Sequence, residues 1–132
     1  MPNVTDLLNK QLAEYSVSGF KSWSWIQQKL KINGKEVVLK DWMKDVLPTF
    51  NTIADKIPGG YVLQVTGHAN RPPEKVKESV LVKLSDRRAK YVFDQFRKLG
   101  LTTNKLTYKG VGTEEFSEGS DNRRVSFKVV KN

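Results

Sequence analysis

The chain has 132 residues, with 23 lysines and arginines against 14 aspartates and glutamates, one histidine and no cysteine, for a formal net charge of +9. This length suits one domain with a modest core, and no apolar run approaches the roughly 20 residues that a membrane helix needs. The lack of cysteine excludes disulfides and thiol chemistry, and a single histidine excludes a histidine-rich metal centre. Composition therefore favours a basic binding domain over an enzyme.

The positive charge is concentrated in the second half of the chain. Residues 1–66 carry 8 basic and 6 acidic side chains, whereas residues 67–132 carry 15 and 8. A basic half either attracts polyanions or forms an ordinary solubilising surface. The N-terminus lacks the pattern of a signal peptide, which fits a cytosolic protein or a domain excised from a longer chain.

The first third of the chain predicts one helix and several short strands. Apolar side chains at helical spacing over residues 4–15 predict a helix with Thr5 as its N-cap. The aromatic residues within 20–26 suggest a strand. An Asn-Gly pair then predicts a hairpin turn between strands 29–32 and 36–39.

The middle and end of the chain alternate between helix and strand patterns. A sustained 3.6-residue period predicts a helix over 40–56, with a kink or break at Pro48, which lacks an N–H donor. Apolar and β-branched runs predict strands at 61–66, 106–109 and 125–129.

The clearest element is a helix predicted over residues 85–99. Ser85 is a natural N-cap, and Gly100 stands where a left-handed C-terminal residue is expected. Arg87 and Arg88 then fall in the first turn, where positive charge costs about 0.3–1 kcal/mol. That cost suggests an anion site built from guanidinium and helix N–H groups. A purely structural ion pair with a neighbouring carboxylate is the competing interpretation.

Taken in order, these elements predict an α+β fold: a helix followed by β-α-β-α-β-loop-β, with two helices on one face of a sheet. We expect residues 1–38 to form an N-terminal helix and a lead-in hairpin. Residues 39–132 then form the main domain.

The sequence carries no recognisable catalytic motif. No Gly-x-Ser-x-Gly or Ser-x-x-Lys arrangement stands at a predicted strand–helix turn, and no glycine-rich phosphate loop ends in Lys-Ser/Thr. Paired carboxylates within 114–121 are typical of a solvated loop. No enzyme activity, cofactor or metal is expected.

Polar residues suited to binding gather next to three predicted elements. His68 and Asn70 follow a strand at Gly67, a residue that permits close backbone approach. Arg123 and Arg124 precede the last strand. Together with the arginines of the 85–99 helix, these residues form the candidate binding set.

The same segments resemble the OmpA C-terminal-like domain family. The family's Gly-His-Thr-Asp, Leu-Ser-x-x-Arg-Ala, Gly-x-Gly and Arg-Arg-Val motifs have counterparts, in order, at residues 66–70, 84–89, 106–112 and 122–125. The resemblance covers about residues 38–131. It implies a β-α-β-α-β-β two-layer sandwich, here with an extra N-terminal helix, and non-covalent binding of the peptidoglycan stem peptide.

The resemblance also implies roles for individual residues. In the family, the motif Asp takes the ammonium of the stem-peptide diamino acid and the motif Arg takes its carboxylate. Arg88 occupies the Arg position, whereas Asn70 occupies the Asp position and lacks its charge. The missing charge would weaken the contact with the ammonium by about 1–2 kcal/mol. Leu81 stands where the family usually has Asn, and the loop between Asn70 and Leu84 is longer and more basic.

The remaining residues of the set receive simpler expectations. His68 is expected to form a structural hydrogen bond rather than to bind metal, and Gly67 to lie beside the ligand. Of Arg123 and Arg124, one is expected to face the ligand and the other solvent. The three tryptophans either stack on sugar rings or cover the core.

Three functional readings follow from the altered motif. The domain binds a wall with a different diamino acid, binds ordinary wall weakly, or has become a protein–protein interaction module in an envelope or secretion assembly. Each implies a periplasmic location, with outer-membrane association in some family branches. A nucleic-acid partner is not expected, because the aromatic strand motif of RNA-recognition domains is missing.

Overall fold

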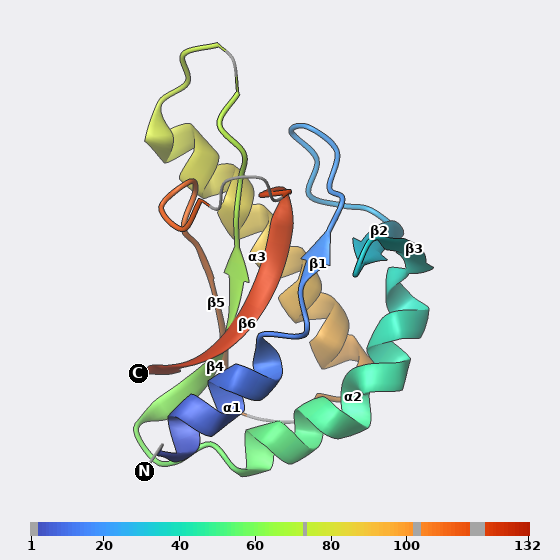
Figure 1. The fold of residues 1–132 in the computed structure, drawn as a ribbon, viewed down its shortest axis with the longest axis vertical. Helices are drawn as coiled ribbons and strands as arrows, with labels where there is room; N and C mark the ends of the chain where they lie inside the picture. The colour runs from blue at the N-terminus through green and yellow to red at the C-terminus, as the bar shows by residue number, and fades with distance from the viewer. Residues whose placement is uncertain (1–2, 73, 102–103, 117–120) are drawn as a thin grey trace.

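The computed structural model describes residues 3–72, 74–101, 104–116 and 121–132. Its elements follow one another along the chain as shown in Figure 1: α1 (Val4–Leu12), β1 (Val17–Ser18), β2 (Lys29–Ile32), β3 (Lys35–Val38), α2 (Leu39–Asp55), β4 (Tyr61–Gly67), α3 (Glu78–Leu99), β5 (Leu106–Gly110) and β6 (Arg124–Lys131). This is the α+β order that the sequence predicts.

The six strands form one mixed sheet in the order β3-β2-β1-β6-β4-β5. Only β4 and β5 run parallel; the other neighbours are antiparallel. β4 lies between β6 and the edge strand β5, with Leu63 opposite Val129 on one side and Leu106 on the other. Because α3 connects the two parallel strands, its length is needed to carry the chain back along the sheet.

An aromatic cluster joins the helices to the sheet. Phe50 of α2 stacks on Phe96 of α3 with ring centroids 4.9 Å apart, and both rings contact Phe127 of β6 at 5.0 and 5.8 Å. Both helices therefore pack on the same face of the sheet. Trp42 packs edge-on against Phe96 at 6.1 Å, so this tryptophan belongs to the core.

The N-terminal helix is attached to the sheet by both packing and hydrogen bonds. Leu8 and Leu12 are buried in the same core. The Asn9 side chain accepts from the Val129 N–H at 2.6 Å and donates to the Val129 carbonyl at 3.1 Å. Asn3, rather than the predicted Thr5, caps the helix, since its side chain accepts from the backbone N–H of Asp6 at 2.9 Å.

The hairpin prediction is confirmed, and β2 and β3 pair across a turn in which Asn33 and Gly34 both have positive φ, at 51° and 79°. The predicted strand over 20–26 is wrong. This segment is a loop, closed by the Gln27 side chain, which accepts from the Lys21 N–H and donates to the Gly19 carbonyl, both at 2.8 Å. A side chain thus replaces the ladder partners that a strand would need.

The two long helices depart from the prediction in instructive ways. α2 continues through Pro48 without a break. α3 begins at Glu78, about two turns before the predicted start at Ser85, and ends as predicted at Gly100, whose φ is 105°. Arg87 and Arg88 therefore lie in the helix interior. The predicted electrostatic cost at a helix N-terminus does not arise.

The boundary between residues 38 and 39 stays a prediction. Residues from both sides contribute to one apolar core, including Val17 and Phe20 before the boundary and Met43 after it. Among the described helices, none is long and apolar enough to cross a bilayer.

Candidate functional site

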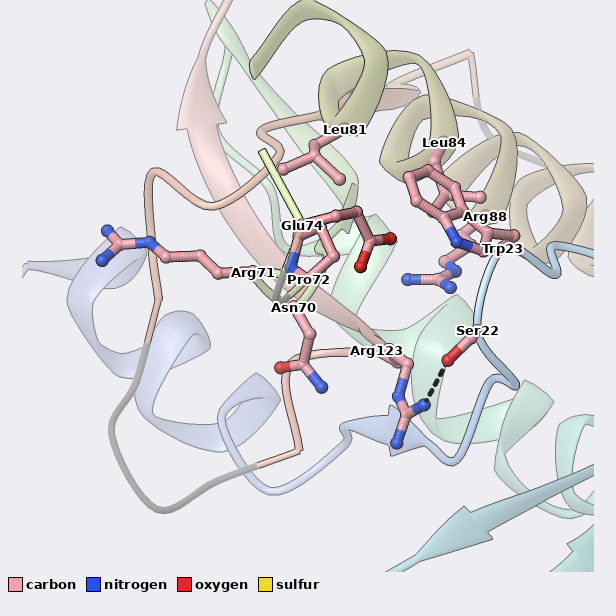
Figure 2. A pocket seen from close by; sticks show the side chains of 10 residues that line it. All are labelled: Ser22, Trp23, Asn70, Arg71, Pro72, Glu74, Leu81, Leu84, Arg88 and Arg123. Carbon is pink, nitrogen blue, oxygen red and sulfur yellow. Dashed lines mark hydrogen bonds between the residues drawn. The ribbon is translucent and has the colours of Figure 1, made fainter. Parts of the chain in front are cut away.

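A pocket of about 320 Å³ opens at the end of the molecule where β4 leaves the sheet. The 19–28 loop and the segment that follows β4 project from this same end (Figure 1). Figure 2 shows the side chains that line the pocket: Ser22, Trp23, Asn70, Arg71, Pro72, Glu74, Leu81, Leu84, Arg88 and Arg123. Three residues of the predicted set, Asn70, Arg88 and Arg123, are therefore brought together although they are distant in sequence.

The pocket is positioned by the close packing of α3 on β4 and β5. A Cβ added to Gly67 would lie 1.8 Å from the Ser85 carbonyl oxygen, and one added to Gly110 would lie 2.1 Å from the Asp86 backbone nitrogen. The Ser85 hydroxyl, predicted to cap a helix, instead donates to the Val82 carbonyl and accepts from the Gly112 N–H, both at 2.8 Å. Gly67 thus allows α3 to pack closely on β4 and does not line the pocket.

Arg88 lines the buried base of the pocket and is held by the backbone. Its guanidinium donates from Nε to the Ser24 carbonyl at 2.8 Å, from Nη1 to the His68 carbonyl at 3.0 Å and from Nη2 to the Lys21 carbonyl at 3.2 Å. The residue is 0% exposed, and its guanidinium carbon lies 5.3 Å from the Phe20 ring centroid. Arg88 therefore ties the 19–28 loop to the end of β4 and places a positive charge beneath the pocket.

Burial lowers the pKa of Arg88 but leaves the side chain charged at neutral pH. Desolvation, reinforced by the positive charge of Arg123, lowers the pKa of Arg88 from 12.5 to about 10. Since that value is well above neutral pH, the guanidinium remains protonated. Its charge contributes to an anion-attracting pocket.

The two arginines before β6 face different surroundings. Arg123 lines the pocket, where its Nη1 donates to the Ser22 hydroxyl at 3.0 Å and its Nε lies 3.5 Å from Asp121. Arg124 does not line it and donates from Nη2 to the Glu115 carbonyl at 3.3 Å. Arg123 is therefore the arginine of this pair that faces the pocket.

Asn70 and His68 have separate roles at the end of β4. The Asn70 side-chain oxygen accepts from the Asn122 N–H at 3.2 Å, which fixes the segment leading to Arg123. His68 is 1% exposed and is absent from the pocket lining; its Nε2 lies 2.8 Å from the Ser126 hydroxyl. The histidine therefore forms the structural hydrogen bond that the sequence predicts.

The environment of His68 strongly favours its neutral form. Desolvation, followed by the positive charge of Arg124, lowers the pKa of His68 from 6.5 to about 4, and Lys128 adds to the shift. Among the described residues, no partner reaches its Nδ1. A buried neutral imidazole of this kind suits a structural role better than proton transfer near pH 7.

The binding set predicted from the sequence leaves out several residues that line the pocket. Ser22 and Trp23 lie in the segment for which the sequence predicts a strand. Trp23 is 44% exposed and has a φ of 61°. Glu74 lies in the long segment between Asn70 and Leu84, whose charged residues are mostly basic. The run of apolar residues before Ser85 indicates that α3 begins before Ser85, so that its first turns form one wall of the pocket.

The arrangement offers binding groups rather than reactive ones. Guanidinium, amide and carboxylate groups surround a wall formed by Leu81 and Leu84. Within the described part of the chain, no three histidine or acidic side chains lie together in a way that could hold a metal ion. Such a pocket can orient a polar ligand with an aliphatic portion.

Comparisons with known proteins identify the fold. No protein-family model and no curated protein matches the sequence. Among solved structures, the peptidoglycan-associated lipoprotein from Burkholderia pseudomallei superposes with a TM-score of 0.59 at 19% identity, covering 97% of this chain and 100% of that one.

Two further structures agree with this match. The OmpA-like domain of FopA1 from Francisella tularensis has a TM-score of 0.56 at 21% identity, over 87% of this chain and 69% of that one. An outer membrane protein from Borrelia burgdorferi has a TM-score of 0.57 at 17% identity, over 89% and 86%. The chain therefore has the fold of the OmpA-like domains.

Proposed function

We propose that this chain is a non-catalytic cell-envelope module that binds the stem peptide of peptidoglycan through the pocket shown in Figure 2. The observation that carries the proposal is the convergence of Arg88, Arg123 and Asn70 on one pocket of an OmpA-like fold. One of the similar structures is itself a peptidoglycan-associated lipoprotein. A periplasmic location follows from this proposal.

The pocket chemistry fits an acidic peptide end. Arg123 presents an accessible guanidinium, and the buried charge of Arg88 adds attraction for a carboxylate without offering a second exposed fork. The apolar wall of Leu81 and Leu84 accommodates the aliphatic part of a side chain. In this proposal these residues bind the ligand and release it unchanged, without any catalytic step.

A sacculus pull-down tests the proposal with Arg123→Ala. The wild type should sediment with purified sacculi, and the variant should sediment several-fold less. Arg97→Ala provides a matched control, because Arg97 is exposed on the same helix as Arg88, about 14 Å further along its axis. Equal sedimentation of wild type and Arg123→Ala would place wall binding elsewhere on the molecule.

A protein–protein interaction module is the alternative that one observation favours. The 19–28 loop exposes apolar surface, with Ile26 65% and Trp23 44% accessible, and Trp23 also lines the pocket. If the wild type does not sediment with sacculi, crosslinking in cells should recover a stable protein partner. Ile26→Ser should weaken that crosslink.

A further inference from the structure

Among the described residues that line the pocket, one side chain is acidic. This residue is Glu74, and it is exposed. Within the described part of the chain it forms no hydrogen bond and no ion pair. An unpaired carboxylate beside guanidinium groups is available to a ligand.

The opposing charges are held apart by structure. Arg88 directs three of its N–H groups to neutral backbone carbonyls, and Arg123 is held beside Asp121 at 3.5 Å and Ser22 at 3.0 Å. Neither therefore lies within ion-pair distance of Glu74. Figure 2 shows the Glu74 carboxylate directed into the pocket, on the side where Arg88 lies, with Arg123 below.

The remaining cation on the rim does not compensate Glu74. Arg71 points away from the pocket in Figure 2, and its guanidinium carbon lies 4.9 Å from the Phe116 ring centroid. Asn70 is uncharged, and its side-chain oxygen already accepts from the Asn122 N–H. Among the described lining residues, an ammonium entering the pocket would thus meet a full negative charge only at Glu74.

These charges select the class of ligand. A simple anion would leave the Glu74 carboxylate without a partner, and a simple cation would be repelled by Arg88 and Arg123. A group that carries an ammonium and a carboxylate at the end of an aliphatic chain satisfies both signs and places its methylenes against Leu81 and Leu84. The zwitterionic end of a diamino acid has this composition.

We infer that Glu74 accepts the ammonium of a zwitterionic diamino-acid end whose carboxylate is directed to Arg123, so that the loop after β4 supplies the negative charge that Asn70 lacks. This inference rests on the proposed function, because it names the ligand group bound by that same pocket. It assigns to Glu74 a binding role that neither its sequence context nor the motif residues indicate.

The test is a calorimetric titration with two synthetic peptides. One ends in a diamino acid whose side chain carries an amine and a carboxylate; the other has that amine acetylated. The wild type should bind the acetylated peptide about fivefold more weakly, because a charge-assisted hydrogen bond is lost at a solvent-exposed site. Glu74→Gln should bind both peptides with the same reduced affinity.

Glu14→Gln is the matched control, because Glu14 is exposed beyond α1 and does not line the pocket; it should retain the wild-type preference. If Glu74→Gln keeps the full preference for the free amine, the role of Glu74 is overturned while wall binding stands. If the wild type binds neither the peptide nor sacculi, both proposals fail. Binding of the free diamino acid as tight as that of the peptide would assign the pocket to the small molecule rather than to the wall.

Discussion

The Arg88 guanidinium donates from Nη1 to the His68 carbonyl at 3.0 Å and thereby joins the middle of α3 to the first residue after β4. The same side chain reaches the 19–28 loop through the Lys21 and Ser24 carbonyls. The residue that the family motif marks for ligand binding is therefore also a structural tie between three segments. Its removal would change folding as well as binding.

Arg88→Lys should accordingly lower the free energy of unfolding by about 2–3 kcal/mol. A lysine ammonium keeps the charge but cannot span three carbonyls with a planar fork, so buried acceptors lose their donors. Urea denaturation followed by circular dichroism measures the change. Arg123→Lys is the comparison and should cost under about 1 kcal/mol, because Arg123 is partly exposed; equal losses would contradict the structural role of Arg88.

His68 should make stability depend on pH. Above pH 6.5 the imidazole is neutral in both states and contributes nothing to the pH dependence. As the pH falls from 6.5 towards 4, the unfolded chain binds a proton that the folded chain does not, so the free energy of unfolding decreases by up to about 3 kcal/mol.

Chemical denaturation of the wild type and His68→Gln between pH 7 and pH 4 measures this contribution. The variant retains a polar side chain near the Ser126 hydroxyl but does not titrate. Its stability should therefore fall less steeply with decreasing pH. Parallel profiles for the two proteins would show that His68 does not carry the predicted effect.

Gly67→Ala should destabilise the protein by about 3 kcal/mol or more. The new methyl group would meet the Ser85 carbonyl oxygen at 1.8 Å, and the backbone of α3 would have to move off β4. Gly59→Ala is the matched control, since nothing lies within 4 Å of its added Cβ. Thermal unfolding of both variants should separate them by many degrees, and a small shift for Gly67→Ala would mean that α3 is more loosely seated.

Asn70→Asp should raise affinity for the free-amine peptide several-fold. The new carboxylate keeps an oxygen that accepts from the Asn122 N–H and adds a negative charge to the pocket. Titration against the free and acetylated peptides measures the gain, which should be confined to the free amine. An equal gain for both peptides would indicate a rearranged pocket instead of a new ammonium contact.

Local signals predicted the parts of the fold that local interactions determine. The Asn-Gly turn between β2 and β3 needs two residues with positive φ, and Gly100 ends α3 in the left-handed conformation. Both requirements are visible in a few adjacent residues. The ordered motifs then indicated the OmpA-like arrangement that the solved structures confirm.

The start of α3 was mispredicted because its N-cap gives no local signal. Lys77 makes no side-chain cap bond, so the good capping residue Ser85 was preferred. The Ser85 hydroxyl is instead engaged by Gly112, 27 residues away. Near the true helix start, the Glu78 carboxylate accepts at 2.8 Å from the N–H of Thr113, which is 35 residues away.

The residues of the pocket also divide into those that sequence motifs predict and those that depend on distant contacts. The motifs identified Asn70, Arg88 and Arg123, which the structure brings together. They could not show that Arg88 is fully buried or that Glu74 enters the pocket, because both depend on how two loops fold over the end of the sheet. The proposed binding roles of all these residues stay predictions until they are measured.

The pairing of the Asn9 amide with Val129 also bears on self-association. β1 pairs only with Arg124 and Val125 of β6, so Val129 lies beyond its end. An open stretch of strand there would be a template on which a second molecule could add its own strand. Since the Asn9 side chain occupies both hydrogen-bonding groups of Val129, the short helix α1 blocks strand addition at this position of β6.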